Sequence, residues 1–238
     1  MSGIWKNIVT KIPFSFVKKI KQGMEVTEVL KQTLKVPEAV FIDVGCHKGE
    51  VLDVALKIAP KGDHYAFEAI KGYYDKLIPK YKNYVYLKNC AITNFIGETE
   101  FTHVSSNPKL SGIKERDYPK NEKIEKIVVK TNTLNNALVN CLRVDLIRID
   151  VEGAEYRVLD GAKDIIFKHK PSILFEHQQG AADYYKNNPD KMWDMLVNQL
   201  GMNIQTLQGF IDKKKPFTKS HFQLLFDTGQ DIYFVAFY

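Results

Sequence analysis

Short β-type runs alternate with amphipathic helical runs through most of the chain, and this alternation constrains the fold more than any other feature. The apolar or alternating runs that predict strands cover residues 39–44, 64–67, 84–87, 145–149 and 172–175. Helical periodicity follows at 51–59, 72–78, 154–166 and 192–200, with Pro60 and Pro79 expected to end the first two helices. Strands that alternate with helices predict an α/β sheet that is largely parallel.

The end of the chain predicts a different closing arrangement. Residues 203–207 and 231–238 are expected to form two final strands joined by a loop rather than a helix, which favours an antiparallel finish to the sheet. Residues 99–104 and 126–131 alternate as a separate β-pair. The polar stretch between them, 105–123, is long for a structureless loop and is interpreted as a lid with Ser111 and Gly112 near its centre.

Acidic residues gather where the predicted parallel strands end. These positions are Asp43, Glu68, Asn89, Asp150 and Glu176. Buried carboxylates are costly, and ligands of open α/β sheets bind at the carboxyl ends of the strands. The pattern therefore indicates a ligand site at that edge of the sheet.

The loop after the first strand, residues 43–49, predicts a nucleoside site. Gly45 and Gly49 allow a tight turn close to a ligand, and Glu68, 25 residues after Asp43, can accept hydrogen bonds from ribose hydroxyls. The loop has neither the GxGxxG pattern of dinucleotide sites nor the GK[ST] of a P-loop. An acid before the glycines favours a cationic ligand such as S-adenosylmethionine, although Asp43 as a plain helix cap is the alternative.

A second acidic motif lies at 147–162, IRIDVEGAEYRVLDGA, which brings Asp150, Glu152 and Glu155 to the start of a helix. Helix N-termini favour negative charge, so capping explains part of this motif. Capping does not explain Asp150 at the tip of the preceding strand.

With these motifs the chain resembles the FkbM-type S-adenosylmethionine-dependent methyltransferases. The matching stretches are FIDVGCHKGE (41–50), AFEAI (66–70), NCAITNFIGETEF (89–101), TNTLNNAL (131–138), LIRIDVEGAEYRVLDGA (146–162) and PSILFEHQ (171–178). The resemblance implies a class I methyltransferase (Rossmann-like) fold, a seven-stranded, mostly parallel sheet with an antiparallel last strand. It also implies O-methylation of hydroxyls on sugars and other small metabolites.

The resemblance assigns parts of the cofactor to particular residues. Asp43, Gly45 and Gly49 would hold the methionine part, Glu68 the ribose, Ala91 the adenine, and Asp150 would stand beside the methyl group. The remaining residues expected in the cofactor site are Cys46, His47, Ala69 and Asn89. Many members have a small residue or Asn where Cys46 and His47 stand, and Asn135 replaces an acid often found after the TL pair.

Methyl transfer to a sugar hydroxyl needs a base, because a hydroxyl is a poor nucleophile until it loses its proton. The candidates are Asp150, Glu152, Glu176 and His177, and His177 has the near-neutral intrinsic pKa that suits a base. An alternative uses Asp150, Glu152 and Glu176 to hold Mg²⁺, which would lower the pKa of the hydroxyl. No metal is the preferred expectation.

The positive charge is concentrated near the N-terminus. The formal charge is +6, and five lysines and no acid lie among residues 1–24, so the rest of the chain carries +1. Residues 1–35 are predicted to form a basic, amphipathic helical segment interrupted at Pro13, ahead of a methyltransferase domain at 36–238. Residues 1–24 are expected to cap the domain, to touch a membrane surface peripherally or to form a subunit interface.

The sequence excludes several other classes of protein and of partner. The near-neutral body offers little affinity for phosphates, and residues 150–153 read DVEG where adenine methyltransferases have [ND]PP[YFW], so no nucleic-acid partner is expected. The expected acceptor is a sugar, nucleotide-sugar or glycan, with a non-sugar metabolite or a non-catalytic nucleoside-binding assembly module as alternatives. Three cysteines without CxxC spacing favour free thiols and a cytoplasmic protein. If residues 1–24 bind lipid, the expected place is the inner face of a membrane.

Overall fold

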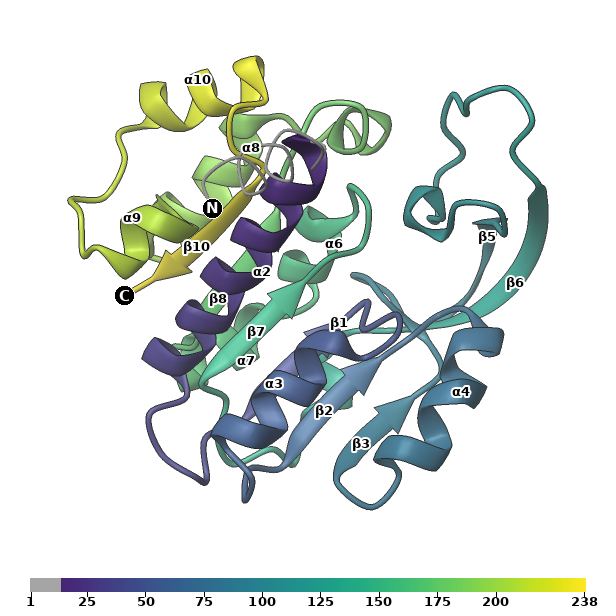
Figure 1. The fold of residues 1–238 in the computed structure, drawn as a ribbon, viewed down its shortest axis with the longest axis horizontal. Helices are drawn as coiled ribbons and strands as arrows, with labels where there is room; N and C mark the ends of the chain where they lie inside the picture. Colours follow the sequence, from purple (N-terminus) through teal and green to yellow (C-terminus); the bar gives the residue numbers. More distant parts are fainter. Residues whose placement is uncertain (1–13) are drawn as a thin grey trace, which may run out of the picture.

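The computed structural model describes residues 14–238, with side chains from residue 20, and its centre is a seven-stranded sheet (Figure 1). The strands are β1 (Phe41–Val44), β2 (His64–Phe67), β3 (Val85–Lys88), β7 (Leu146–Ile149), β8 (Ser172–Glu176), β9 (Asn203–Thr206) and β10 (Tyr233–Phe237). Their order across the sheet is β3-β2-β1-β7-β8-β10-β9. The pairs from β3 to β8 are parallel, and β10 is antiparallel to both of its neighbours. The predicted sheet with an antiparallel last strand is confirmed.

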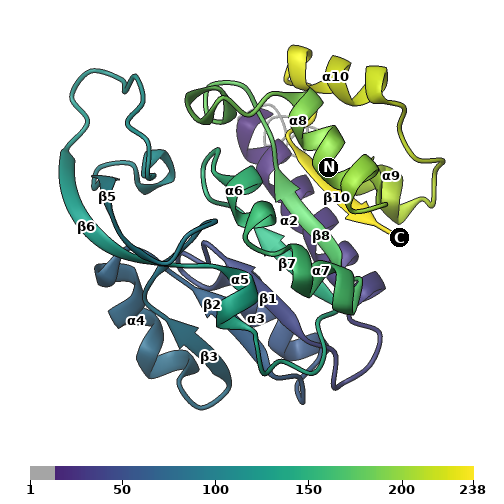
Figure 2. The ribbon, with the colours of Figure 1, turned by 180° about the vertical axis from the view of Figure 1, so that it is seen from behind.

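Helices cover both faces of this sheet. The face in front in Figure 1 carries α2 (Phe14–Thr33), α3 (Glu50–Ile58) and α4 (Lys71–Tyr81), and α9 (Leu207–Ile211) packs against α2. The face in front in Figure 2 carries α5 (Leu134–Ala137), α6 (Glu155–Asp160) and α7 (Lys163–His169). Side chains of α8 (Pro189–Trp193), the π-helix η3 (Asp194–Gln199) and α10 (Lys219–Thr228) join the same core as those of α6 and α7.

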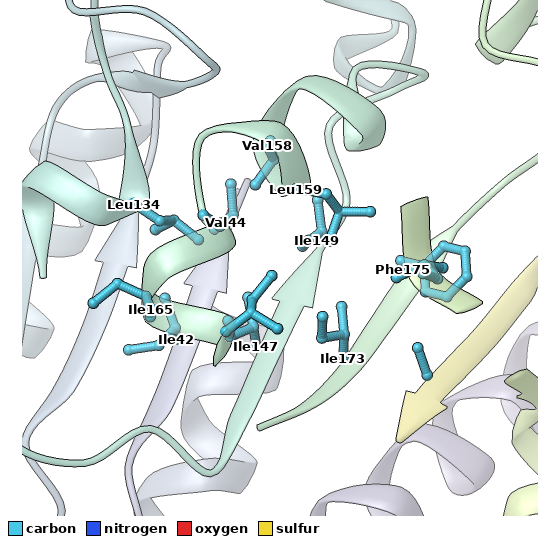
Figure 3. Packing of buried hydrophobic residues seen from close by; sticks show 14 of the residues in the cluster. Ile42, Val44, Leu134, Ile147, Ile149, Val158, Leu159, Ile165, Ile173 and Phe175 are labelled. Carbon is cyan, nitrogen blue, oxygen red and sulfur yellow. The ribbon is translucent and has the colours of Figure 1, made fainter. Parts of the chain in front are cut away.

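The sheet separates two apolar cores because neighbouring residues of a strand point to opposite faces. Ile147 and Ile149 of β7 pack with α5, α6 and α7, as Figure 3 shows, whereas Leu146 packs on the other side. Strands buried on both faces are expected to be apolar throughout, which explains the nearly continuous apolar runs in the sequence.

A smaller sheet lies beyond the carboxyl ends of the parallel strands (Figure 1). It consists of β4 (Ala91–Ile92), β5 (Gly97–Val104) and β6 (Ile124–Asn132) in the order β4-β6-β5, with β5 and β6 antiparallel. The predicted β-pair is therefore confirmed. The segment 105–123 joins β5 to β6 and includes the short 3₁₀ helix η1 (Pro108–Leu110).

Two expectations about helices are wrong. Pro79 does not end α4, because the Lys82 N–H donates to the Ile78 carbonyl at 3.0 Å and closes a further turn. Tyr81 holds this turn, with its hydroxyl 2.8 Å from both the Gly49 carbonyl and Asp53 Oδ1. The last two strands are also not joined by a simple loop, since α9 and α10 lie between β9 and β10. Phe222, Leu225 and Phe226 bury the inner face of α10, a periodicity that the sequence reading overlooked.

The N-terminal part of the described chain is one helix. Residues 1–13, which include the first predicted amphipathic piece and Pro13, lie outside the described residues. Helix α2 runs on past the second piece to Thr33, and its Val29 and Leu30 are fully buried in the core that includes Phe41 and Leu52. Among residues 14–238 no helix is long and apolar enough to cross a membrane. The division into residues 1–35 and 36–238 remains a prediction.

Candidate active site

A cavity of about 770 Å³ opens at the carboxyl ends of the parallel strands. Seven of the residues predicted for the cofactor or the chemistry line it from the loops after β1, β2 and β7: Gly45, Cys46, His47, Glu68, Ala69, Asp150 and Glu152. Ala91 and Glu176 also line it. Of the five predicted strand-end residues, Glu68, Asp150 and Glu176 line the cavity, although they are up to 108 positions apart in the sequence, whereas Asp43 and Asn89 do not line it.

The glycines of the first loop are required by its geometry. Gly45 has a φ of +83°, and a Cβ there would collide with the carbonyl oxygen of Asp150. Gly49 has a φ of +77°, and its Cβ would lie 2.5 Å from the Tyr81 hydroxyl. Gly45 therefore lets the loop after β1 approach the tip of β7, whereas Gly49 lies outside the cavity lining and shapes the start of α3.

Glu68 joins the loops after β1 and β2. Its Oε2 accepts a hydrogen bond from the His47 N–H at 2.9 Å, and its Oε1 accepts one from the Ile70 N–H at 2.8 Å. Burial raises the pKa of Glu68 to about 7, although both backbone hydrogen bonds act to lower it. Each carboxylate oxygen keeps a second lone pair, so the side chain can still accept hydrogen bonds from ribose hydroxyls.

The other residues predicted beside Glu68 divide into two groups. Asn89 lies outside the lining and donates from Nδ2 to the carbonyls of Glu68 and Ala69, at 2.8 and 3.0 Å, so it supports the turn. Ala69 and Ala91 form an apolar wall with Phe101 and Ile113, which suits the flat face of a purine. Phe101 on β5 and Ile113 after it were not predicted, because only the smaller sheet brings them to the cavity.

Cys46 and His47 lie in the loop between the two glycines. Burial, together with the nearby Asp43 and Glu68, raises the pKa of the Cys46 thiol well above its ordinary value, so this cysteine is an inert wall group. His47 has a φ of +49°, and its ring packs on Tyr73 with 4.4 Å between centroids. Burial lowers the pKa of His47, which keeps its ring neutral at pH 7.

Asp43 is paired within the protein rather than exposed to the cavity. It is fully buried and does not line the cavity, and its Oδ1 lies 2.8 Å from Nη1 of Arg148. The other guanidinium nitrogen of Arg148 forms an ion pair with Asp150. Arg148 thus links the first strand to the tip of β7, and the sequence reading missed it because it sits inside a strand.

The turn after β7 is held in an unusual backbone conformation. Glu152 has a φ of +57° and Gly153 a φ of +100°, where a Cβ would collide with the Ala181 carbonyl. Glu155 is buried, and its Oε1 accepts hydrogen bonds from the N–H groups of Val151 and Gly153, both at 3.1 Å. Burial raises the pKa of Glu155 to about 8. Glu155 shapes the turn, and Glu152 is presented to the cavity.

Asp150, Glu152 and Glu176 form one acidic cluster, with an oxygen of each within 4.8 Å of the others. Burial raises the pKa of Glu152 to about 7, with Asp150 adding to the shift and Arg116 opposing it. Burial and then Asp150 and Glu152 raise the pKa of Glu176 well above its ordinary value. Carboxylates this close cannot all ionise, so the cluster holds a proton at neutral pH. The three oxygens also match the hard ligands that Mg²⁺ prefers.

His177 is placed away from the cluster. It follows Glu176 at the end of β8, so its side chain turns to the opposite face, and it does not line the cavity. Its ring packs between Phe222 and Phe226, with centroid distances of 5.7 and 4.7 Å, and within the described chain neither ring nitrogen has a hydrogen-bond partner. Burial lowers its pKa to about 4. This geometry corrects the expectation that His177 is a base.

The segment 105–123 closes one side of the cavity, as expected of a lid. Lys109 and Ser111 line the cavity, and Ser111 and Gly112 are held to β5 rather than lying free at the centre of the loop. The Lys114 N–H donates to the Tyr185 hydroxyl at 3.0 Å. Nη2 of Arg116 lies 3.3 Å from Oε2 of Glu152. The lid is therefore fastened both to the segment after β8 and to the acidic cluster.

The strand order, the antiparallel β10, the glycine loop after β1 and the acid ending β2 together define a class I methyltransferase fold of the Rossmann-like type. A sequence model of the FkbM methyltransferase domain matches residues 43–204. The chain belongs to the FkbM methyltransferase family.

Comparison with solved structures finds similar folds at low identity. A methyltransferase FkbM from Methylobacillus flagellatus is 12% identical over 85% of this chain and 44% of that chain, with a TM-score of 0.48. The precorrin-6y C5,15-methyltransferase of Geobacter metallireducens is 14% identical over 90% and 87%, with a TM-score of 0.46. A fibrillarin from Aeropyrum pernix with natively bound S-adenosyl-L-methionine is 10% identical over 89% and 73%, with a TM-score of 0.42.

This chain spans less than half the length of the Methylobacillus flagellatus protein. No curated protein sequence matches the chain significantly.

Proposed function

We propose that this protein is an S-adenosylmethionine-dependent O-methyltransferase that methylates a hydroxyl of a sugar or glycan. The observation that carries the proposal is the acidic cluster of Asp150, Glu152 and Glu176 in the same cavity as Glu68 and the Gly45 loop. Family membership supports methyl transfer as the reaction. A cavity rich in carboxylates suits a cofactor that carries a sulfonium and an ammonium group.

The residues of the cavity fit this cofactor in three respects. Glu68 can accept hydrogen bonds from the ribose, and Ala69, Ala91 and Phe101 offer an apolar wall to the adenine. Asp43 is neutralised by Arg148, so the methionine ammonium would meet backbone carbonyls of the loop rather than the Asp43 carboxylate. When bound, S-adenosylmethionine supplies an electrophilic methyl group.

The acidic cluster supplies the proton chemistry. An acceptor hydroxyl must lose its proton as it attacks, and a base whose pKa lies near 7 serves this step best at neutral pH. Glu152, with a pKa of about 7, meets this requirement, and burial beside the other carboxylates raises the pKa of its partner Glu176 and favours the protonated form of Glu176. Asp150 remains paired with Arg148 at the end of β7 and orients the hydroxyl. Closing of the lid excludes water from the reacting atoms.

Two expectations about the site are kept as alternatives. A divalent cation held by the acidic cluster would lower the pKa of the acceptor hydroxyl directly, so that water could take up its proton. A non-sugar metabolite that carries a hydroxyl would use the same residues.

Three further proposals concern partners and location. We propose that the protein has no nucleic-acid partner, that it is cytoplasmic, and that it docks at a membrane through residues 1–24.

The test combines binding with turnover. Isothermal titration of the full-length protein with S-adenosylmethionine and S-adenosylhomocysteine measures cofactor binding. Transfer of a labelled methyl group to a panel of sugars, nucleotide-sugars and glycans measures catalysis. Binding without transfer to any hydroxyl acceptor would support the non-catalytic module, and absence of cofactor binding would reject the proposed function altogether. Asp212→Asn, at an exposed acid, is the control for unspecific loss of charge.

A further inference from the structure

Helix α2 forms a wall of the cavity that the family match does not include. Gln22, Gly23, Val26 and Thr27 line the cavity, whereas the matched region begins at residue 43. Val26 belongs to the same apolar cluster as Val51 and Val54 of α3, and one turn further along α2 the buried Val29 and Leu30 anchor the helix in the core. This wall is therefore fixed to the domain by packing.

The part of the cavity beside α2 is bordered by Val51 and Val54 of α3 on one side and by Tyr233 of β10 on the other. Tyr233, the first residue of β10, lines the cavity and pairs with Glu176 of β8 in the sheet register. Because residues directly opposite each other in an antiparallel pair share one face of the sheet, the Tyr233 side chain lies on the same face as Glu176 of the acidic cluster. Adjacent strands lie about 4.8 Å apart, and β10 and β2 each lie two strands from β7, on opposite sides of it. Each of them is therefore roughly 10 Å from β7.

This division leaves room for two ligands. A cofactor that extends from Glu68 on β2 to Asp150 on β7 uses one half of the cavity. The other half, from Asp150 to Tyr233, is bounded by α2, which lies alongside β7, β8 and β10 in Figure 1. Asp150 and the acidic cluster stand between the two halves, where a methyl group would pass from one ligand to the other.

The side chains around the second half are mostly uncharged, and apolar groups such as Val26 and Ile232 alternate with polar ones. Gln22, Thr27, Gln178 and Tyr233 offer amide and hydroxyl groups. The charged groups nearby are already engaged, because Arg148 is paired with Asp43 and Asp150, and Glu176 accepts a hydrogen bond from Gln178. The lysines in the lining, Lys48 and Lys109, lie on the other side, near His47. Such a surface suits hydroxyl groups better than phosphate.

We propose that the acceptor binds between α2 and the ends of β8 and β10, that it is a neutral, polyhydroxylated molecule, and that Gly23 limits its size. This inference rests on the proposed function and adds the place and charge of the acceptor. It also gives part of the N-terminal segment a role in recognition.

Gly23 offers a direct test of the wall. It lines the cavity, and a Cβ built there meets no atom of the described chain within 4 Å. A larger side chain at this position therefore occupies open space instead of displacing the core. Gly72 in α4 is a matched control, since it is also a helical glycine with no described atom within 4 Å of a Cβ, and it does not line the cavity. Replacing either glycine favours its helix.

The experiment compares wild type, Gly23→Leu and Gly72→Leu as full-length proteins. Titration calorimetry measures the Kd of S-adenosylhomocysteine. Saturation-transfer NMR and titration then measure binding of methyl glycosides of glucose, mannose and rhamnose, and of UDP-glucose, to the protein loaded with S-adenosylhomocysteine. We expect Gly23→Leu to weaken binding of the preferred methyl glycoside roughly tenfold or more, as overpacking of a fitted site does. Cofactor binding and the Gly72→Leu protein should match wild type.

Each contrary outcome overturns a separate part of the proposal. Equal glycoside binding by Gly23→Leu and Gly72→Leu would place the acceptor elsewhere in the cavity. If the wild-type protein binds UDP-glucose but no methyl glycoside, the acceptor is not a neutral molecule and that part of the proposal is wrong. The same holds if the wild-type protein binds S-adenosylhomocysteine but none of these sugars. A wild-type protein that does not bind S-adenosylhomocysteine would instead remove the proposed function on which the inference rests.

Discussion

Arg148 is expected to be the residue of the site whose loss destabilises the fold most. Its guanidinium is the charged partner of Asp43, which is fully buried, and it also pairs with the half-buried Asp150. Arg148→Met leaves Asp43 as a buried carboxylate without a counter-charge. Removing one partner of a buried ion pair costs about 3–5 kcal/mol, and Asp150 adds little because water can reach it.

The magnitude can be measured by unfolding in urea and by heat. Each kcal/mol corresponds to about 2–4 °C in Tm for a domain of this size, so we expect Arg148→Met to lower Tm by roughly 6–20 °C. Lys214→Met removes an exposed ion pair with Asp212 at 3.5 Å and is the control, with an expected change within about 0.5 kcal/mol.

A double-mutant cycle identifies the cause. Asp43→Asn removes the buried charge, so the protein with both Asp43→Asn and Arg148→Met should lose clearly less stability than the sum of the two single changes. The cost of Arg148→Met alone should also grow with pH. The pKa of a buried carboxyl without its partner is raised, and stability is then lost as pH rises through the range between its unfolded and folded values. Additive single effects, or a loss no larger than that of Lys214→Met, would refute this reasoning.

The remaining predictions concern the chemistry, the buried histidine, the metal and the N-terminus. Asp150→Asn should keep S-adenosylhomocysteine affinity and lower turnover about 10²-fold, because Asp150 orients the acceptor hydroxyl, and wild-type turnover in this variant would refute this role. The pKa of His177 is about 4 in the folded protein against an ordinary 6.5, so the unfolded chain binds more protons between these values. The free energy of unfolding should therefore fall by up to about 3 kcal/mol as pH drops from 6.5 to 4. Urea titrations of His177→Phe should lack this decrease, and an unchanged pH dependence in that variant would contradict the prediction. Turnover should survive EDTA, and a loss that Mg²⁺ restores would instead support a cation on the acidic cluster. In liposome flotation, the full-length protein should float with anionic vesicles more than residues 25–238 do, and equal flotation would remove the membrane role of residues 1–24.

The sequence predicted the parts of the site that follow from local patterns. Each parallel strand has a short apolar run with a recognisable end, so Glu68, Asp150 and Glu176 could be assigned to one edge of the sheet before the fold was known. Gly45 was predicted because the tight loop after β1 requires it. The order of elements also sufficed for the sheet, since alternating strands and helices have few other ways to bury both faces.

The parts that the sequence could not predict depend on contacts between distant segments. Arg148 looked like one polar residue inside a strand, and its role follows from its partner 105 positions away. Tyr233 and Gln22 reach the cavity only because β10 inserts beside β8 and α2 packs across the sheet. His177 was assigned from its intrinsic pKa, but its place next to Glu176 on a strand turns it into the core.

Glu68 has a consequence for the rate of cofactor exchange. Its two oxygens hold N–H groups of two different loops, so neither loop can open without breaking a hydrogen bond to the same carboxylate. The end of the cavity proposed for adenosine is therefore shaped before any ligand arrives, and binding there requires little ordering of the chain. The residence time of the cofactor should then depend on how often the lid opens, while the loops that contact the nucleoside stay closed.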